Sequence, residues 1–307
     1  MTFVSREKPS LIKRRFMQPD NLTLYAFLFL PLVLILVFFL YPLVAVFFYS
    51  FNDLNSLVDP FKFHGLENFR WALSNPYFGQ AIRNTLLFTV LSLLGQTTLG
   101  ILSALILNQD ELPARTFFRG VLLFAWVMPE LIVAAIFLMI FGNNISVVNY
   151  WLEQLGLSRV GWLNDPDIAL YTLIIVNIWK GLPFNIIIYL TALQGISKDY
   201  YEAAKLDGAN VWQQFQALTF PFLLPTILST LILSTIWTSN VFFLPFVMTG
   251  GGPLNATMLW SLSIYNTIFK NLQLSRGAAM SVIVYLILLA IGIFYYIFLR
   301  RNQQELK

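Results

Sequence analysis

The chain contains no cysteine and a single histidine, His64. The absence of cysteine excludes disulfides, a thiol nucleophile and thiolate metal sites. One histidine also excludes a multi-histidine metal site and most histidine-based catalytic triads. No Gly-x-x-x-x-Gly-Lys-Ser/Thr segment occurs, so the chain has no phosphate-binding loop of that type. We therefore expect no catalytic residue, no metal site and no cofactor in this chain, and an energy source in another subunit or an ion gradient.

Charge is also scarce. Only 11% of the 307 residues are charged, whereas 58% are hydrophobic. Soluble domains carry about 25% charged residues. A soluble fold of this length could not bury so much apolar surface, so the composition predicts an all-α integral membrane protein. The small net charge of +4 fits basic residues at cytosolic membrane edges and does not indicate nucleic-acid binding.

Long stretches with at most one Asp, Glu, Lys or Arg predict six transmembrane helices, because a charge at mid-bilayer costs about 3 kcal/mol. Two of these stretches hold one charge each, Glu130 and Lys180. A third stretch, 208–269, is 62 residues long, but glycines at 250–252 followed by Pro253 divide it. The predicted helices cover residues 23–50, 84–108, 120–142, 169–194, 220–247 and 277–299.

The basic residues predict the orientation. With both termini in the cytosol, twelve of the 19 Lys and Arg lie in cytosolic segments, six lie outside and Lys180 lies within a span, as the positive-inside rule requires. The expected organisation is a cytosolic tail over 1–22, a first helix over 23–50, a core over 81–299 that holds the other five helices, and a cytosolic tail over 300–307.

One cytosolic loop, 198–219, is long enough for two short helices. Good helix formers follow Glu202, and Gly208 permits a left-handed turn. A second amphipathic stretch has an apolar face made of Val211, Trp212, Phe215 and Leu218. Ala203 and Ala204 offer a flat surface beside the charge of Glu202, which favours docking into a groove on a cytosolic partner. The alternative is a helix lying on membrane lipid, although the loop holds more acidic than basic residues.

The same loop resembles a known signature. Glu202-Ala203-Ala204, then Gly208 after three residues, then Leu218, Phe220 and Pro221, is similar to the EAA motif of ABC importer permeases. That motif commonly has Ile and Leu where this chain has Leu218 and Phe220, which is a conservative difference. Asp207-Gly208-Ala209 and Trp212 resemble the carbohydrate-uptake branch, as do Thr249–Pro253 and Trp179–Phe184.

The resemblance implies a type I ABC importer permease fold and transport of a sugar, oligosaccharide or polyol by alternating access. It implies a heterodimer with a second permease, two ATPase subunits that bind ATP and Mg, and an extracytoplasmic solute-binding protein, in a bacterial inner membrane. The loop then acts as a coupling helix, and the residues expected to contact the ATPase are Glu202, Ala203, Ala204, Asp207 and Gly208.

A sugar path needs hydrogen-bonding side chains and aromatic faces. The candidates are Asn177, Trp179, Lys180, Asn185, Trp237, Thr238 and Asn240. The alternative for each is helix–helix packing, where polar contacts contribute about 0.6 kcal/mol. Lys180 lies near mid-span, where ionisable groups mark a pathway or pair with a partner such as Glu130. Glu130 follows Pro129, which favours a local structural or gating role.

Two other classes of function remain open from the residues. A gradient-driven secondary transporter is the first alternative, although Glu130 is the single acidic residue within the predicted helices. An intramembrane enzyme is the second, although no paired carboxylates occur in these helices. Dependence on ATP or on an ion gradient separates the importer from the first alternative, and turnover by the purified chain alone identifies the second.

Overall fold

A computed structural model describes residues 21–54, 60–109, 115–142 and 146–305, with side chains for 27–54, 60–109, 116–142 and 146–298. The predicted tail over 1–22 therefore lies almost entirely outside the described residues. The chain divides into two units, Met1–Phe48 and Tyr49–Lys307, which are described separately. Within the described ranges the structure consists of helices and one isolated β-bridge, Asn52–Phe63.

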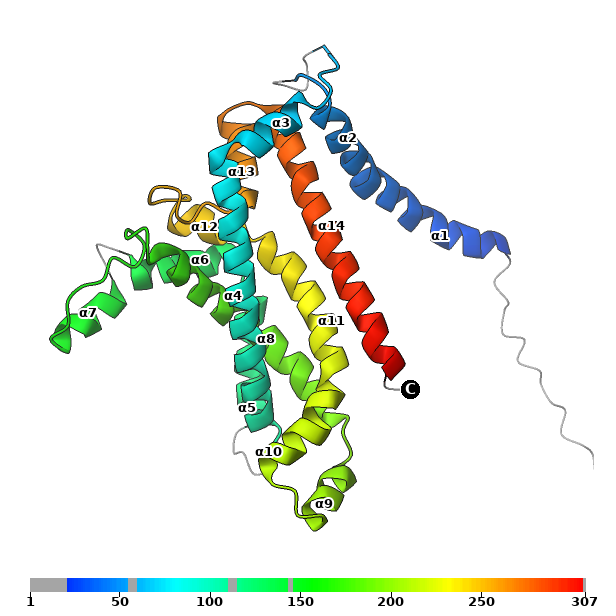
Figure 1. The fold of residues 1–307 in the computed structure, drawn as a ribbon, viewed down its shortest axis with the longest axis vertical. Coiled ribbons are helices and arrows are strands. Elements are labelled where there is room, and N and C mark those ends of the chain that lie inside the picture. The colour runs from blue at the N-terminus through cyan, green and yellow to red at the C-terminus, as the bar shows by residue number, and fades with distance from the viewer. Residues whose placement is uncertain (1–20, 55–59, 110–114, 143–145, 306–307) are drawn as a thin grey trace, which may run out of the picture. The chain divides into compact units, whose positions relative to one another are not determined.

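The first unit is a long apolar helix (Figure 1). It comprises α1 (Asn21–Ile35), a π-helical turn (Leu36–Leu40) and the start of α2 (Tyr41–Ser50). The π-turn ends just before Pro42, which has no N–H to continue the α-helical ladder. The stretch Phe27–Ser50 has a mean hydropathy of 2.8, and its side chains are mostly exposed within the chain. A helix that is apolar on all sides is suited to lipid, which supports the predicted first span.

The second unit contains the remaining helices (Figure 1). They are α3 (Glu67–Ser74), α4 (Pro76–Leu107), α5 (Arg115–Val127), α6 (Glu130–Phe141), α7 (Val147–Gln154), α8 (Ala169–Gln194), α9 (Lys198–Leu206), α10 (Val211–Gln214), α11 (Phe220–Ser239), α12 (Phe243–Met248), α13 (Trp260–Tyr265) and α14 (Leu274–Glu305). In the described part of the whole chain, five helical stretches are long and apolar enough to cross a membrane, and α5 with α6 forms a sixth if counted as one broken span.

The predicted span 120–142 is not one continuous helix. It divides into α5 and α6, which meet at a bend of 99°. Pro129 disfavours helical geometry at the residue before it and has no N–H for the helical ladder. The new helix begins on the Pro129 carbonyl, which accepts from the N–H groups of Ile132 at 3.0 Å and Val133 at 3.1 Å. Hydropathy could not reveal this break, because both halves are apolar.

The predicted helix 220–247 also differs from the structure. It begins earlier, because α10 continues through a π-turn (Phe215–Thr219) into α11 without leaving helical geometry. The turn accommodates Pro221, so this proline does not mark a separate entry into the membrane. At the other end, α11 stops at Ser239, and α12 begins only at Phe243.

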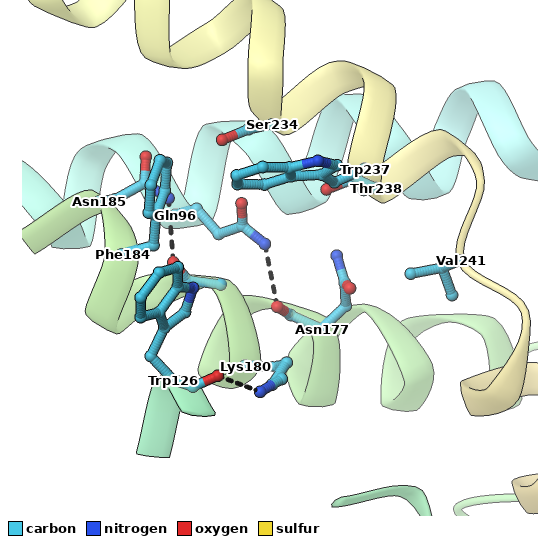
Figure 2. Close-up of a pocket in the computed structure, with 11 residues that line it drawn as sticks. Gln96, Trp126, Asn177, Lys180, Phe184, Asn185, Ser234, Trp237, Thr238 and Val241 are labelled. Atoms are coloured by element: carbon cyan, nitrogen blue, oxygen red, sulfur yellow. Dashed lines mark hydrogen bonds between the residues drawn. The ribbon is translucent and has the colours of Figure 1, made fainter. Parts of the chain in front are cut away.

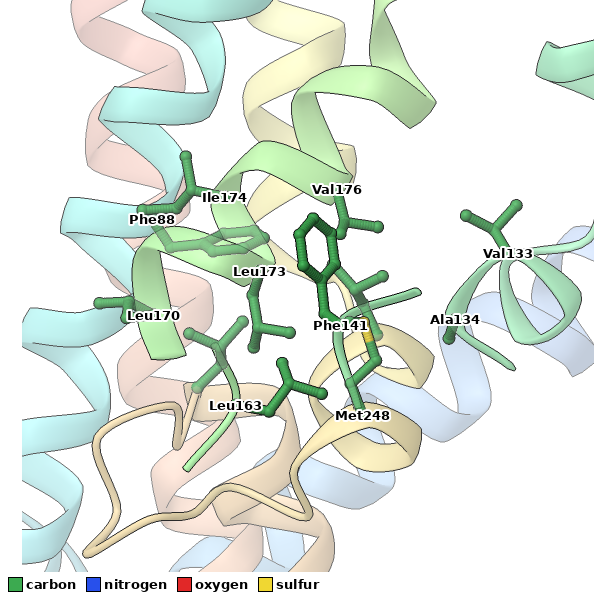
Figure 3. Packing of buried hydrophobic residues seen from close by; sticks show 12 residues of the cluster. Phe88, Val133, Ala134, Phe141, Leu163, Leu170, Leu173, Ile174, Val176 and Met248 are labelled. Carbon is green, nitrogen blue, oxygen red and sulfur yellow. The ribbon is translucent and has the colours of Figure 1, made fainter. Parts of the chain in front are cut away.

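Close packing joins the spans of the second unit. Figure 3 shows a buried cluster that includes Phe88 of α4, Phe141 of α6, Leu173 and Val176 of α8, and Met248 of α12. This cluster connects α6 and α12, two short helices that each follow a break, to the two long helices α4 and α8. The short segments are therefore held in place by buried apolar contacts, although neither is long enough to be a stable helix alone.

Candidate functional site

A cavity of about 150 Å³ lies among α4, α5, α8 and α11. Figure 2 shows the residues around it. They are Gln96, Trp126, Asn177, Lys180, Gly181, Phe184, Asn185, Ser234, Trp237, Thr238 and Val241. The α8 members recur at helical spacing, as do Ser234, Trp237, Thr238 and Val241 on and just after α11, so two helix faces converge on one space.

Three amides give the cavity its polar character. The Gln96 Nε2 atom donates to the Asn177 carbonyl at 2.9 Å, and the Asn185 Nδ2 atom donates to the Gly181 carbonyl at 3.0 Å. The Asn177 Nδ2 atom is buried without a hydrogen-bond partner. Figure 2 shows this amide directed from α8 toward the α11 side of the cavity. A buried donor without a partner is costly, so Asn177 is suited to bind a hydroxyl that enters this space.

Three aromatic rings form another part of the wall. Trp126 and Phe184 are stacked with ring centroids 5.8 Å apart, and Phe184 meets Trp237 edge-on at 5.1 Å. These rings come from three helices, α5, α8 and α11. A sugar ring has apolar C–H faces and polar hydroxyl edges, so aromatic rings beside amides match both of its surfaces.

The structure brings together five of the seven residues predicted for the substrate path, Asn177, Lys180, Asn185, Trp237 and Thr238. The other two lie elsewhere. Trp179 packs edge-on against Phe137 at 5.1 Å, and the Asn240 Nδ2 atom donates to the Ile236 carbonyl at 2.8 Å. Trp179 is two residues from Asn177, so it lies about 200° away around the helix.

Five further residues with side chains line the cavity and are absent from the predicted set: Gln96, Trp126, Phe184, Ser234 and Val241. Some of them had a usable signal. Phe184 lies seven residues after Asn177, and Ser234 lies four residues before Thr238, so both share a helix face with a predicted residue. Gln96 and Trp126 belong to other helices, and only the three-dimensional packing reveals them.

Gly181 allows α4 to approach the cavity closely. A Cβ atom built on Gly181 would collide with the Gln96 side-chain amide. We expect Gly181→Ala to displace Gln96, break its bond to Asn177 and destabilise the protein by about 1–3 kcal/mol. Gly292→Ala on α14 is the matched control, because its Cβ meets no atom within 4 Å. Thermal unfolding in detergent compares the two variants, and an equal change in Tm would contradict this interpretation.

The two charges within the spans contact the backbone. The Lys180 Nζ atom donates to the carbonyls of Trp126 at 2.7 Å and Met128 at 2.5 Å, with Ala125 at 3.4 Å. The Glu130 Oε1 atom accepts from the Leu244 N–H at 3.1 Å. The sequence left a pathway role or a pairing partner such as Glu130 open for Lys180; its hydrogen bonds show a further, structural role at the break between α5 and α6.

The predicted loop contains two short helices, α9 and α10, as expected. The turn between them has the hydrogen bonds of a Schellman motif. The Gly208 N–H donates to the Lys205 carbonyl at 3.0 Å, and the Ala209 N–H donates to the Ala204 carbonyl at 2.9 Å. Gly208 has φ +80°, so the predicted left-handed turn is confirmed. Asn210 then caps α10 through a capping box with Gln213.

The predicted contact residues share the outer surface of this loop. Glu202, Ala203, Asp207 and Gly208 are exposed, and Ala204 is half-buried. Three apolar side chains beside them are also exposed: Leu206 at 89%, Val211 at 83% and Trp212 at 63%. The loop is joined to the span that follows, because the Tyr201 hydroxyl lies 2.9 Å from the Thr219 hydroxyl. The result is an ordered surface with both apolar and charged groups.

Comparison with known proteins gives consistent matches. The family described as "Binding-protein-dependent transport system inner membrane component" matches residues 96–306. The trehalose/maltose transport system permease protein MalF of Thermococcus litoralis is 35% identical over 268 residues, covering 87% of this chain and 90% of that protein. The multiple sugar-binding transport system permease protein MsmF of Streptococcus mutans is 35% identical over 266 residues, covering 86% of this chain and 90% of that protein.

A solved structure extends the likeness to the fold. A chain of a bacterial alginate ABC transporter, crystallised in complex with a periplasmic protein bound to alginate pentasaccharide, superposes with a TM-score of 0.80. The two chains are 26% identical, and the match covers 92% of this chain and 95% of that one. The chain therefore has the type I ABC importer permease fold.

Proposed function

Because the chain belongs to the family of binding-protein-dependent transport system inner membrane components, we propose that it forms one half of a sugar-translocating pore. In this proposal a second permease completes the pore, and an extracytoplasmic binding protein delivers the solute. The solute class is supported by the relatives that the chain resembles, which include sugar and arabino-oligosaccharide permeases. ATP and Mg are bound by separate ATPase subunits.

One observation carries the mechanism: a continuous helical segment leads from the exposed loop to the cavity. It comprises α10, the π-turn and α11, with helical backbone at the joints Phe215 and Phe220. α11 contributes Ser234, Trp237 and Thr238 to the cavity wall. A displacement of the loop by an ATPase would therefore move one wall of the cavity, which is the coupling that alternating access requires.

The loop surface is suited to the ATPase contact. Leu206, Val211 and Trp212 are exposed, and a protein partner would bury their apolar area together with the flat Ala203 surface. In this orientation the loop and both termini are cytoplasmic, as the distribution of Lys and Arg predicts. We place the protein in the inner membrane of a bacterial cell, with the first unit and the outer faces of the spans in contact with lipid.

Purification of the tagged chain from native membranes in mild detergent tests this assembly. We expect mass spectrometry to identify a second multi-span permease and an ATPase with a phosphate-binding loop. Leu206→Asp is expected to remove the ATPase and retain the permease, because it places a charge at the apolar contact. Leu254→Asp is the matched control: Leu254 is 84% exposed but lies in the loop between α12 and α13.

Two outcomes would contradict the proposal. Recovery of the chain alone, from an extract in which known complexes survive, would favour a gradient-driven carrier. Equal loss of the ATPase in Leu206→Asp and Leu254→Asp would show that the contact lies elsewhere on the chain.

A further inference from the structure

The break between α5 and α6 places free backbone groups at membrane depth. The last carbonyls of a helix have no partner within that helix, and they carry a partial negative charge. Hydrocarbon offers no water to satisfy them. The carbonyls of Ala125 and Trp126 at the end of α5, and of Met128 just after it, lie within reach of the Lys180 ammonium.

Lys180 satisfies this helix end from a different helix. It lies in the middle of α8, and its Nζ atom is 2.7 Å from the Trp126 carbonyl and 2.5 Å from the Met128 carbonyl, with Ala125 at 3.4 Å. Figure 2 shows the bond from Lys180 to the Trp126 backbone at the edge of the cavity. A lysine ammonium has three N–H donors and no acceptor, so these three carbonyls use its full donor capacity.

Glu130 acts in a related way on the other side of the break. It is the first residue of α6, and its Oε1 atom accepts from the N–H of Leu244, at the start of α12, at 3.1 Å. The first N–H groups of a helix also lack partners within the helix. The cation and the anion at the break therefore each bind backbone groups of a neighbouring element, and together they connect α5, α6, α8 and α12.

We propose that Lys180 is a positioning residue that holds the break between α5 and α6, and that the cavity consequently selects uncharged, polyhydroxylated solutes. This inference rests on the proposed function of the cavity. Among the described residues that line the space, Lys180 is the single ionisable one. An anionic solute could pair with it only by taking the ammonium away from three carbonyls. Amides, hydroxyls and aromatic rings remain for the solute.

The first experiment measures solute charge selectivity. The probes are maltotriose and maltobionate, and quenching of tryptophan fluorescence reports binding to the purified complex in nanodiscs. We expect maltotriose to bind at least about tenfold more tightly than maltobionate, since the cavity offers no free cation to compensate carboxylate desolvation. The double variant Trp126→Phe/Trp237→Phe is the control, because loss of the quenching in this variant assigns the fluorescence signal to the cavity.

The second experiment measures the bend itself and needs no solute. The chain has no cysteine, so Phe117→Cys and Met139→Cys give an isolated pair of spin-label sites on exposed positions of α5 and α6. At the observed bend of 99° the two sites are separated by about 20 Å, against about 33 Å along a straight helix. We expect Lys180→Met to broaden and lengthen the distance distribution, and Lys180→Arg to restore it.

The results separate the possible roles of Lys180. Preference for maltobionate that disappears in Lys180→Met, with unchanged spin-label distances, would overturn the proposal and identify Lys180 as a cation for an acidic solute. Equal binding of the two solutes would overturn the charge selectivity. Absence of binding by either solute would contradict the proposed function of the cavity, and the spin-label distances would then decide the positioning role on their own.

Discussion

Gly208→Val is expected to reduce coupled solute uptake about tenfold or more, whereas Glu202→Ala reduces it about fivefold at most. Gly208 has φ +80°, a conformation that costs a residue with a Cβ about 1–2 kcal/mol and a β-branched residue more. A difference of 1.4 kcal/mol is a factor of about ten. A Cβ at Gly208 meets no atom within 4 Å, so the effect arises from the backbone turn and not from a steric clash.

The geometry explains why this turn affects function. Gly208 forms the Schellman turn that sets the direction of α10 relative to α9. A different turn would misplace the exposed surface of the loop, which lies at the start of the segment that leads to the cavity. Glu202 is exposed, and an exposed ion pair with a partner contributes only about 0–1 kcal/mol. Its contribution to coupling is therefore smaller than that of the turn.

Uptake and ATP hydrolysis in proteoliposomes, measured for the same preparations, test this ranking. Gly208→Val is expected to retain the folded chain but to lose ATP hydrolysis stimulated by the binding protein. Gly156→Val is the matched control, because Gly156 also has a positive φ, +75°, and open space at its Cβ, but follows α7. An equal loss of uptake in Glu202→Ala, or in Gly156→Val, would contradict the assignment of coupling to the turn at Gly208.

Features that depend on residues close together in the sequence were predictable, whereas features that depend on which helices are neighbours were not. The loop was predictable because its determinants are local: Ser197 and Asn210 cap the two helices, and Gly208 forms the turn between them. The long spans were predictable for a similar reason, since a charge in hydrocarbon is costly at any position along a helix. Neither kind of argument requires knowledge of which helices are neighbours.

The cavity was only partly predictable, because its composition depends on helix packing. A span that is apolar on all sides gives no periodic signal for the face that points inward. Polar and aromatic residues could therefore be selected by type, but Trp179 and Asn240 point elsewhere, and Gln96 and Trp126 come from other helices. The break at Pro129 was missed for a related reason. A proline in a span is tolerated when a neighbouring helix satisfies the freed backbone groups, and here that neighbour is Lys180 of α8.

Trp237→Ala is expected to reduce solute uptake about tenfold or more while basal ATP hydrolysis is retained. Trp237 lies on α11 and meets the Phe184 ring edge-on at 5.1 Å on the cavity wall. Aromatic contacts contribute about 0.5–1.5 kcal/mol beyond the area they bury, and loss of the indole also removes one face of the space that would hold a sugar ring. Trp237→Phe keeps an aromatic face and is expected to recover part of the uptake.

Trp179→Ala is the matched control for this prediction. Both indoles lie in the spans and are partly exposed, at 40% for Trp179 and 53% for Trp237, and residue type alone ranks them equally. Trp179 packs on Phe137, away from the cavity, so its loss is expected to lower Tm and leave the solute concentration at half-maximal uptake unchanged. α11 carries Trp237 and follows directly from the loop that contains α9 and α10. Loss of uptake with intact ATP hydrolysis in Trp237→Ala would therefore show that this residue contacts the solute and is not needed for coupling to the ATPase. An equal effect of the two variants on solute dependence would contradict the cavity as the solute path.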